Sequence, residues 1–531
     1  MKILMLSPPF LYRFSRTSRS PAISKGGCVY YPIWMGYATG VLEQAGHDVK
    51  LIDAPANGMT QDDIIGLVSE WKPELMVLDS VTASFRNDVR VLEALKATNP
   101  NSFAIMVGTH VGALPEESIK ASTQIDAVAR GEYDYILRDL ANALGNKLPL
   151  SEVLGITYRE DGKIKFTPNM PPLETPELDA MPFASKVYKK HLRINDYFYP
   201  SVLFPEITII TGRGCKFRCT FCKFPQTLTG HSYRARSPKN VVDEFEWISR
   251  NLPEVKDIMI EDDTLTQDKE RMIEISKEVI ARKLNVTWTC NARADVDLET
   301  MQWMKKAGCR LLCVGFESSN QEILNNIKKG TRIDKIEQFM VDTKKAGILV
   351  HGCFMLGNRG ETNETIKATV EWAKKLDPDT AQFFPLMLYP GTEAYKWASE
   401  NNFLSTHNWE EWLTPEGTHN TILNTDKLSA KELVNGCDWA RKEFYMRPSY
   451  MLGRVKIALT QPREARRLLM GSRTFMKYLF DIEFWKKSAA MKQVKDEKNA
   501  VASAETEQKE DEKEVQVAVA REPIFRIRQE N

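Results

Sequence analysis

The stretch that decides the fold of this chain reads Cys215-Lys216-Phe217-Arg218-Cys219-Thr220-Phe221-Cys222. It supplies three thiols at C-x3-C-x2-C spacing, with an aromatic residue directly before the last cysteine. A four-iron cluster normally takes four thiolates, so three close cysteines without a fourth leave one iron open to a small molecule. A zinc knuckle is the alternative, and His231 is the nearby candidate for its fourth ligand. The spacing favours the iron–sulfur cluster.

Six short apolar runs flank this cysteine loop, and helical patterns separate them. The first spans 202–210, directly before the cysteines, and the last ends near residue 386. The later runs end in Glu261-Asp262-Asp263-Thr264, Cys290-Asn291-Ala292-Arg293, Gly315-Phe316-Glu317-Ser318, Leu356-Gly357-Asn358-Arg359-Gly360-Glu361 and Tyr389-Pro390-Gly391-Thr392. Six strand–helix units predict a partial (β/α)6 TIM-like barrel over residues 201–400. Its site should lie at the carboxyl ends of the strands, where the polar residues collect.

The first 150 residues show the same alternation and predict a separate α/β domain. Apolar runs at 2–6, 49–52, 75–78, 103–107 and 125–129 alternate with helical patterns. Short buried strands of this kind indicate a Rossmann-like, doubly wound parallel sheet, whose ligands bind at the carboxyl ends of the strands. No G-x-G-x-x-G follows the first strand, which argues against a nicotinamide nucleotide.

The remaining segments differ in composition. Residues 151–200 hold six prolines in a stretch of weak periodicity and predict an extended linker. Residues 401–493 predict a helical region, and residues 494–531 are charged and nearly free of aromatics, which predicts a disordered tail. Between residues 441 and 492 there are 13 Lys or Arg against 4 Asp or Glu, interleaved with apolar residues. This basic amphipathic region predicts either peripheral binding to an anionic membrane surface or a helical subdomain packed on the barrel.

Composition narrows the class of protein. A net charge of +1 over 531 residues gives no signature of nucleic-acid binding. Nine cysteines, an odd number, argue against a disulfide framework and for a reducing compartment. Because no signal peptide or apolar stretch of transmembrane length is visible, we expect a cytoplasmic enzyme. The basic region after residue 441 adds the expectation of a peripheral position on the inner face of the membrane.

The cysteine motif resembles that of the radical S-adenosylmethionine (SAM) family. In that family the open iron binds the amino and carboxylate groups of SAM, and an electron from the cluster cleaves SAM to a 5′-deoxyadenosyl radical. The resemblance implies a 4Fe-4S cluster on Cys215, Cys219 and Cys222 and an electron donor such as flavodoxin or ferredoxin. The strand ends match the family's SAM motifs in order, at Glu261, Asp262, Arg293, Glu317, Ser318 and Gly357. By resemblance the first two contact the SAM amino group, the arginine its carboxylate, the next two its ribose and the glycine its adenine.

The N-terminal domain resembles the cobalamin-binding domain that precedes many radical SAM barrels. The matching strand ends imply cobalamin contacts at Ser7, Pro8, Thr82, Ser84, Gly108, His110 and Gly131. The D-x-H-x-x-G signature is absent, so a bound cobalamin would lack a protein imidazole on its lower face. The alternative is a docking domain that binds no ligand.

The longer runs Thr211–Cys215 through Thr227 and Gly230 to Pro238 look like the radical SAM family associated with hopanoid biosynthesis. This resemblance implies cyclitol ether formation on a lipid substrate, by rearrangement of a substrate radical. A cobalamin-dependent methyltransferase acting on an unactivated carbon is the first alternative. A non-catalytic cobalamin-binding or redox-sensing protein is the second.

Other candidate ligands have simpler interpretations. Cys290, Cys309, Cys313 and Cys353 lie in or beside predicted buried elements, where free cysteine is a common core residue, although a second cluster is conceivable. His351 lies within a predicted strand. This position favours a core or pocket residue over a metal ligand.

Overall fold

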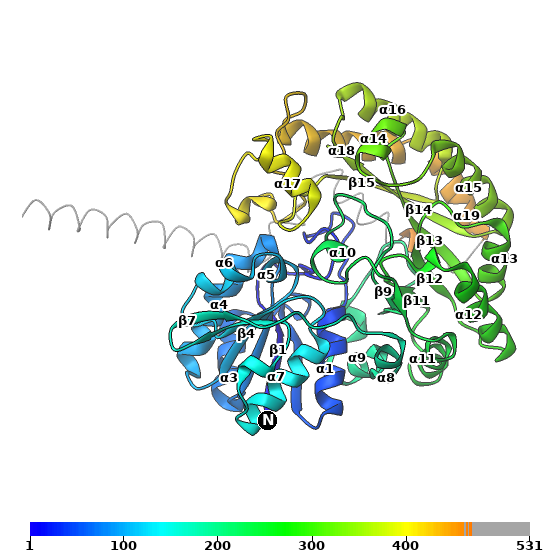
Figure 1. Ribbon diagram of the computed structural model, residues 1–531. Coiled ribbons are helices and arrows are strands. Elements are labelled where there is room, and N and C mark those ends of the chain that lie inside the picture. The colour runs from blue at the N-terminus through cyan, green and yellow to red at the C-terminus, as the bar shows by residue number, and fades with distance from the viewer. Residues whose placement is uncertain (461–463, 466, 470–531) are drawn as a thin grey trace, which may run out of the picture. The chain divides into compact units, whose positions relative to one another are not determined.

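The computed structural model describes residues 1–460, 464–465 and 467–469, which contain two large sheets (Figure 1). The N-terminal sheet has the strand order β2-β1-β3-β4-β5-β6-β7, and its first five strands are parallel. The predicted doubly wound domain is therefore confirmed. Its strands are β1 (Lys2–Ser7), β2 (Asp48–Asp53), β3 (Leu75–Asp79), β4 (Phe103–Val107), β5 (Ala127–Ala129), β6 (Ile156–Glu160) and β7 (Lys163–Phe166).

Helices cover both faces of this sheet, so its central strands are buried on both sides and are apolar almost throughout. Helix α1 packs against α7, and α3 packs against α4. The helices and 3₁₀ turns of this part are α1 (Ile33–Gln44), α2 (Ala54–Asn57), α3 (Gln61–Trp71), η1 (Thr82–Ser84), α4 (Phe85–Thr98), α5 (Thr109–Ala113), α6 (Pro115–Lys120), α7 (Asp134–Asn146), η2 (Leu150–Glu152), α8 (Thr175–Ala180), α9 (Ala184–His191) and η3 (Ile194–Asp196).

The prediction of an extended linker over 151–200 is wrong for much of that segment. Strands β6 and β7 form an antiparallel hairpin that joins the N-terminal sheet at β5, so the sheet runs on to Phe166. The hairpin turn is Asp161-Gly162, a dipeptide typical of two-residue β-hairpins. The edge strand β7 is mostly exposed and carries no apolar run, which explains why periodicity missed it. Helix α9 then packs against α1, with Tyr188 fully buried.

The second sheet confirms the predicted partial barrel. Its six strands are all parallel and lie in the order in which they follow along the chain, from β8 to β15. Helices α11 to α13, α15 and α16 lie along the outer side of the strands (Figure 1). The strands are β8 (Glu206–Ile209), β11 (Asp257–Ile260), β12 (Trp288–Ala292), β13 (Cys309–Glu317), β14 (Leu349–Leu356) and β15 (Thr380–Pro385), with a two-stranded ribbon of β9 (Gly212–Arg213) and β10 (Arg234–Ala235). The helices and 3₁₀ turns are α10 (Lys223–Thr227), α11 (Pro238–Asn251), η4 (Leu265–Gln267), α12 (Lys269–Ala281), α13 (Leu298–Lys306), α14 (Gln321–Asn326), α15 (Ile333–Ala346) and α16 (Asn363–Leu376).

The C-terminal elements are α17 (Glu393–Glu400), η5 (Trp409–Trp412), α18 (Ala430–Tyr445) and α19 (Pro448–Thr460). Helix α18 packs on β15 and α16. Arg447 and Arg454 pair with Asp377 and Asp379 of the barrel at 3.0 and 3.1 Å, so this part of the basic region is packed on the barrel. The predicted tail 494–531 and most of 461–493 lie outside the described residues.

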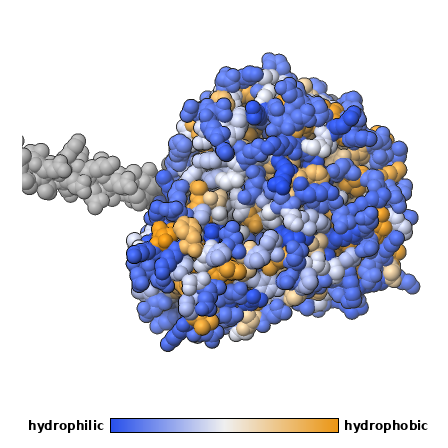
Figure 2. Space-filling model, viewed as in Figure 1, coloured by the Kyte–Doolittle hydropathy of each residue, from blue (hydrophilic) through white to orange (hydrophobic). Residues whose placement is uncertain are grey.

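The described surface in Figure 2 is largely hydrophilic, with hydrophobic residues in small patches. None of the helices in the described ranges has the length and apolar character needed to span a bilayer.

Candidate active site

The cysteine loop follows the carboxyl end of β8 and lies between the two strands of the ribbon, β9 and β10. Gly214, directly before Cys215, has a φ of +81°, and a Cβ there would collide with the carbonyl oxygen of Ser232. Only glycine fits this position without strain. The side-chain amide of Gln226 donates to the carbonyl oxygens of Cys219, Thr220 and Cys222 at 3.3, 3.1 and 2.8 Å. The Gln226 side chain therefore holds the backbone of the cysteine loop.

His231, the candidate zinc ligand, has a different role. Its Nδ1 lies 3.1 and 3.0 Å from the carbonyl oxygens of Cys215 and Phe217 and so closes the cysteine loop. Within the described ranges, no group of three or more Cys, His, Asp or Glu side chains could hold a single metal ion.

Three acidic residues after β11 point in different directions. Asp262 is buried and accepts from the backbone N–H and the hydroxyl of Thr211 at 2.6 and 2.7 Å, so it joins β11 to β8 and does not face the cavity. The predicted SAM contact of Asp262 is thus not supported. Asp263, the third acidic residue of this strand end, does line the cavity and accepts from the Gly214 N–H at 3.1 Å. Burial raises its pKa.

Glu261 is placed as predicted, on the cavity wall. One of its carboxylate oxygens pairs with Arg19, a residue of the N-terminal domain. The other, Oε2, is buried and has no hydrogen-bond partner among the described residues. A buried carboxylate oxygen needs a donor, and the SAM ammonium is of the right chemistry.

Arg293 and Glu317 also line the cavity. Arg293 lies over the ring of Phe217, with its guanidinium carbon 3.5 Å from the ring centroid and Nη1 4.0 Å from Cys219 Sγ. Glu317 accepts from Lys329 Nζ at 2.8 Å, while its Oε2 is buried without a partner in the described part of the chain. Arg293 already donates through Nη2 to the Lys329 carbonyl and Thr331 Oγ1 and through Nε to Asp295, whereas Glu317 Oε2 is open to a polar group of SAM.

Ser318 and Gly357 are not brought to the cavity. The hydroxyl of Ser318 accepts from the Asn320 N–H at 3.2 Å and serves the local backbone. The N–H of Gly357 donates to Glu361 at 2.6 Å, and that carboxylate also accepts from the Asn358 N–H. Neither Ser318 nor Gly357 lines the cavity, so their predicted SAM contacts are not supported.

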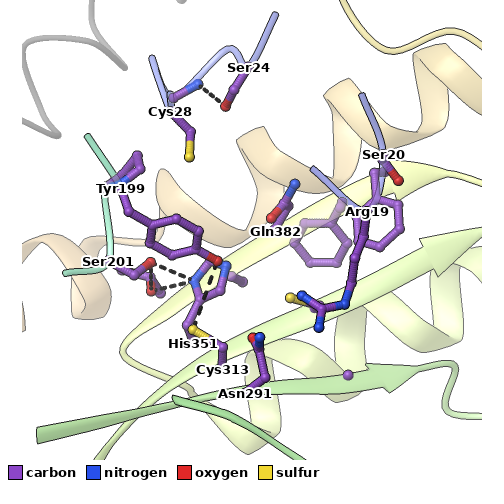
Figure 3. A pocket seen from close by; sticks show the side chains of 18 of the residues that line it. Arg19, Ser20, Ser24, Cys28, Tyr199, Ser201, Asn291, Cys313, His351 and Gln382 are labelled. Carbon is purple, nitrogen blue, oxygen red and sulfur yellow. Dashed lines mark hydrogen bonds between the residues drawn. The ribbon is translucent and has the colours of Figure 1, made fainter. Parts of the chain in front are cut away.

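The cavity has a volume of about 1030 Å³, at the upper end of the range for ligand pockets. Figure 3 shows its inner wall, where Tyr199, Ser201, Asn291, Cys313, His351 and Gln382 converge and Arg19 reaches down from its loop. His351 Nδ1 lies 3.0 Å from Ser201 Oγ and 2.7 Å from Thr380 Oγ1. Burial lowers the pKa of His351 to about 4, so it is neutral at pH 7. The predicted pocket role of His351 is confirmed.

The four barrel cysteines outside the cluster motif divide into two kinds. Cys290 and Cys309 are buried in strands, as expected of core residues. Cys313 and Cys353 line the cavity, and Cys313 Sγ lies 3.9 Å from the Tyr199 hydroxyl. Nothing in their spacing distinguished the two kinds, because the difference depends on which face of each strand looks inward.

The predicted cobalamin residues lie together at the carboxyl ends of β1, β3, β4 and β5. Ser7 Oγ accepts from Arg16, Thr82 Oγ1 lies 3.2 Å from His110 Nδ1, and Ser84 donates to Asp88 at 2.6 Å. Pro8 follows β1, and Gly131 follows β5. Gly108 has a φ of +108°, and a Cβ there would meet the Ser80 carbonyl, so the strand ends are closely packed.

Two buried polar atoms have no hydrogen-bond partner among the described residues: His110 Nε2 at this edge and Lys223 Nζ on the neighbouring helix α10. Lys223 directly follows Cys222, is 2% exposed, and has a pKa lowered to about 7 by burial. The amide side chains of a corrin carry both donors and acceptors, so these atoms fit cobalamin. Burial lowers the pKa of His110 to about 3, and its ring packs between Phe85 and Trp409.

Buried ion pairs join the two domains beside the cysteine loop. Arg213, two residues before Cys215, binds both carboxylate oxygens of Asp134 at 2.6 and 3.2 Å and lies 3.3 Å from Glu132. Arg234 also pairs with Glu132, at 2.6 Å. The predicted residues of both cofactor sites are thus fixed relative to one another through the β9–β10 ribbon.

Comparisons with known proteins agree with this geometry. A model of the B12 binding domain matches residues 20–141, and a model of the radical SAM superfamily matches residues 209–373. An uncharacterized methyltransferase of Pyrococcus horikoshii is 31% identical over 457 residues, covering 85% of this chain and 94% of the relative. An anaerobic magnesium-protoporphyrin IX monomethyl ester cyclase of Rubrivivax gelatinosus is 27% identical over 463 residues, covering 86% and 80%.

A solved structure shares the fold. It is that of the radical SAM methyltransferase TsrM from Kitasatospora setae with cobalamin and a [4Fe-4S] cluster bound, with a TM-score of 0.59 and 18% identity over 82% of this chain and 84% of that one. The chain therefore belongs to the radical SAM superfamily, among the members with an N-terminal B12-binding domain, and its cofactors are a 4Fe-4S cluster, SAM and cobalamin.

Proposed function

We propose that this protein is a cobalamin-dependent radical SAM methyltransferase that acts on an unactivated carbon. The observation that carries the proposal is that one cavity is lined by the three cluster cysteines, by Glu261 and Arg293, and by residues 18–20 of the N-terminal domain. A substrate in this cavity would lie beside the cluster cysteines and the predicted SAM residues, in contact with a loop of the N-terminal domain. The methyltransferase name of the 31% identical relative supports the same activity.

When bound, the cluster and SAM supply a 5′-deoxyadenosyl radical, and cobalamin supplies the methyl group. The protein's own residues bind, orient and exclude water. The Ser201–His351–Thr380 group offers hydrogen bonds without a charge, because His351 is neutral. Apolar side chains such as Met355, Phe383 and Leu386 fill much of the remaining wall. We infer a substrate whose reacting part is uncharged.

The fate of SAM tests the proposal. Reconstituted protein is incubated anaerobically with SAM, cobalamin, and flavodoxin or ferredoxin as electron donor. Methyl transfer consumes SAM in two ways, so both S-adenosylhomocysteine and 5′-deoxyadenosine should form. An enzyme that rearranges its substrate would form 5′-deoxyadenosine alone, and a non-catalytic binding protein would form neither product. Each of these two outcomes contradicts the proposal.

Cyclitol ether formation in hopanoid biosynthesis and binding to a membrane surface stay predictions. They rest on the resemblance of residues 211–238 and on the basic region after residue 441. The cyclase among the relatives shows that methyl transfer is not the reaction of every similar protein. Mass spectrometry of membrane lipids from a deletion strain and its parent tests the substrate. Flotation with anionic liposomes tests the membrane contact, which should be partly released by high salt.

A further inference from the structure

One loop of the cobalamin-binding domain reaches into both cofactor sites. At its base Arg16 is fully buried, pairs with Asp88 at 2.5 Å and donates to Ser7 Oγ at 3.2 Å. Three residues later, Arg19 leaves the domain and pairs with Glu261 at the end of β11. These partners lie 242 residues apart in the sequence.

The contacts of Arg19 fix it at the cavity wall. Beside the ion pair with Glu261, its Nη2 donates to the carbonyl oxygen of Asp262 at 2.9 Å. Its guanidinium carbon lies 5.8 Å from the ring centroid of Phe224, which belongs to the helix after the cysteine loop. A planar guanidinium can hold two acceptors at once in a defined direction, as a lysine cannot.

The loop around Arg19 is itself anchored. The carbonyl oxygen of Ser20 lies 3.0 Å from His419 Nε2, and the N–H of Ile23 donates to the Gly417 carbonyl at 2.8 Å. Arg19 is therefore presented to the barrel from a loop that is held at both ends.

The two carboxylate oxygens of Glu261 differ in their partners. Arg19 occupies Oε1, while Oε2 is buried, faces no described donor and belongs to a side chain that lines the cavity beside the cluster cysteines. A side chain with one oxygen fixed and one oxygen free has a defined direction for its next hydrogen bond. Without Arg19, the Glu261 carboxylate would lose its ion-pair partner and the contact that fixes its direction.

We infer that Arg19 is a positioning residue for SAM, supplied by the cobalamin-binding domain: it orients the carboxylate of Glu261, whose free oxygen accepts from the SAM ammonium. This inference rests on the SAM site of the proposed function but not on the methyl transfer itself. SAM binding thereby depends on a loop whose base, at Arg16, lies among the strand ends that hold cobalamin.

The test compares Arg19→Gln and Arg19→Lys with wild type, all reconstituted anaerobically with iron, sulfide and cobalamin. The SAM dissociation constant is measured by equilibrium dialysis and by titration of the EPR signal of the reduced cluster. Arg19→Gln should raise the constant about tenfold, with an unchanged spectrum at saturating SAM, and Arg19→Lys should recover part of the loss, because the charge remains but the fork does not. Arg13→Gln, on the same loop with its guanidinium on the Gly27 carbonyl, is the control and should bind as wild type does.

Three results would overturn the inference. The first is a dissociation constant for Arg19→Gln within twofold of wild type, and the second is tighter binding, which would mean that Arg19 competes with SAM. The third is an altered EPR spectrum at saturation in both Arg19 variants, which would mean a structural role. None of these depends on methyl transfer. Wild-type protein that binds SAM but forms no S-adenosylhomocysteine would remove the methyltransferase proposal and leave the role of Arg19 intact.

Discussion

Replacing Arg213 by Met should destabilise the junction between the domains. The guanidinium is 2% exposed and holds both oxygens of Asp134, itself 2% exposed. Removing one partner of a buried ion pair costs about 3–5 kcal/mol, because the other charge stays buried without compensation. Arg234 still neutralises Glu132, so Asp134 alone is left uncompensated. We therefore expect the free energy of unfolding to fall by about 3 kcal/mol, which changes the unfolding equilibrium constant roughly 100-fold.

Urea unfolding of the cluster-free protein, followed by tryptophan fluorescence, measures this loss. The double variant R213M/D134L replaces the pair by apolar side chains and should regain most of the stability, since such replacements of buried pairs are often nearly neutral. Arg193→Met is the control, because that exposed arginine pairs with Asp196 at the surface and should contribute under about 1 kcal/mol. A single variant as stable as the control, or a double variant no better than the single, would refute the reasoning.

Gly214→Ala should remove most of the iron bound after reconstitution, because a Cβ collides with a backbone carbonyl; Gly230→Ala, with a similar φ of +74° but open space, is the control, and equal iron contents would contradict the account. Burial raises the pKa of Glu206 from 4.5 to about 8, so the folded state binds the proton more tightly and stability falls as pH rises from about 4.5 to about 8. Glu206→Gln should lose that slope in urea unfolding at pH 5 and pH 8, and an unchanged slope would assign it to other groups. Lys223→Met should retain several-fold less cobalamin through gel filtration while keeping its iron; equal retention would show that the ammonium does not bind the corrin side chains.

The sequence alone determined the parts of this protein that depend on local patterns. The order of strands and helices, the two α/β domains and the cysteine loop all follow from apolar runs of strand length and from the spacing of Cys215, Cys219 and Cys222. Glycine, proline and polar residues gather where strands end, because parallel strands put their functional loops at one edge. The edge that carries the site was therefore predictable.

Only the tertiary structure decided which side chains of that edge face the cavity. Asp262 and Asp263 are adjacent and chemically equal, yet Asp262 accepts hydrogen bonds from Thr211 whereas Asp263 lines the cavity. Arg19 carried no signal in the sequence, because its partner Glu261 comes from the other domain. The hairpin β6–β7 was missed for a related reason: an exposed edge strand needs no apolar run, since its stability comes from pairing with a neighbour. Direction and long-range pairing are properties of the packed chain, and no local pattern records them.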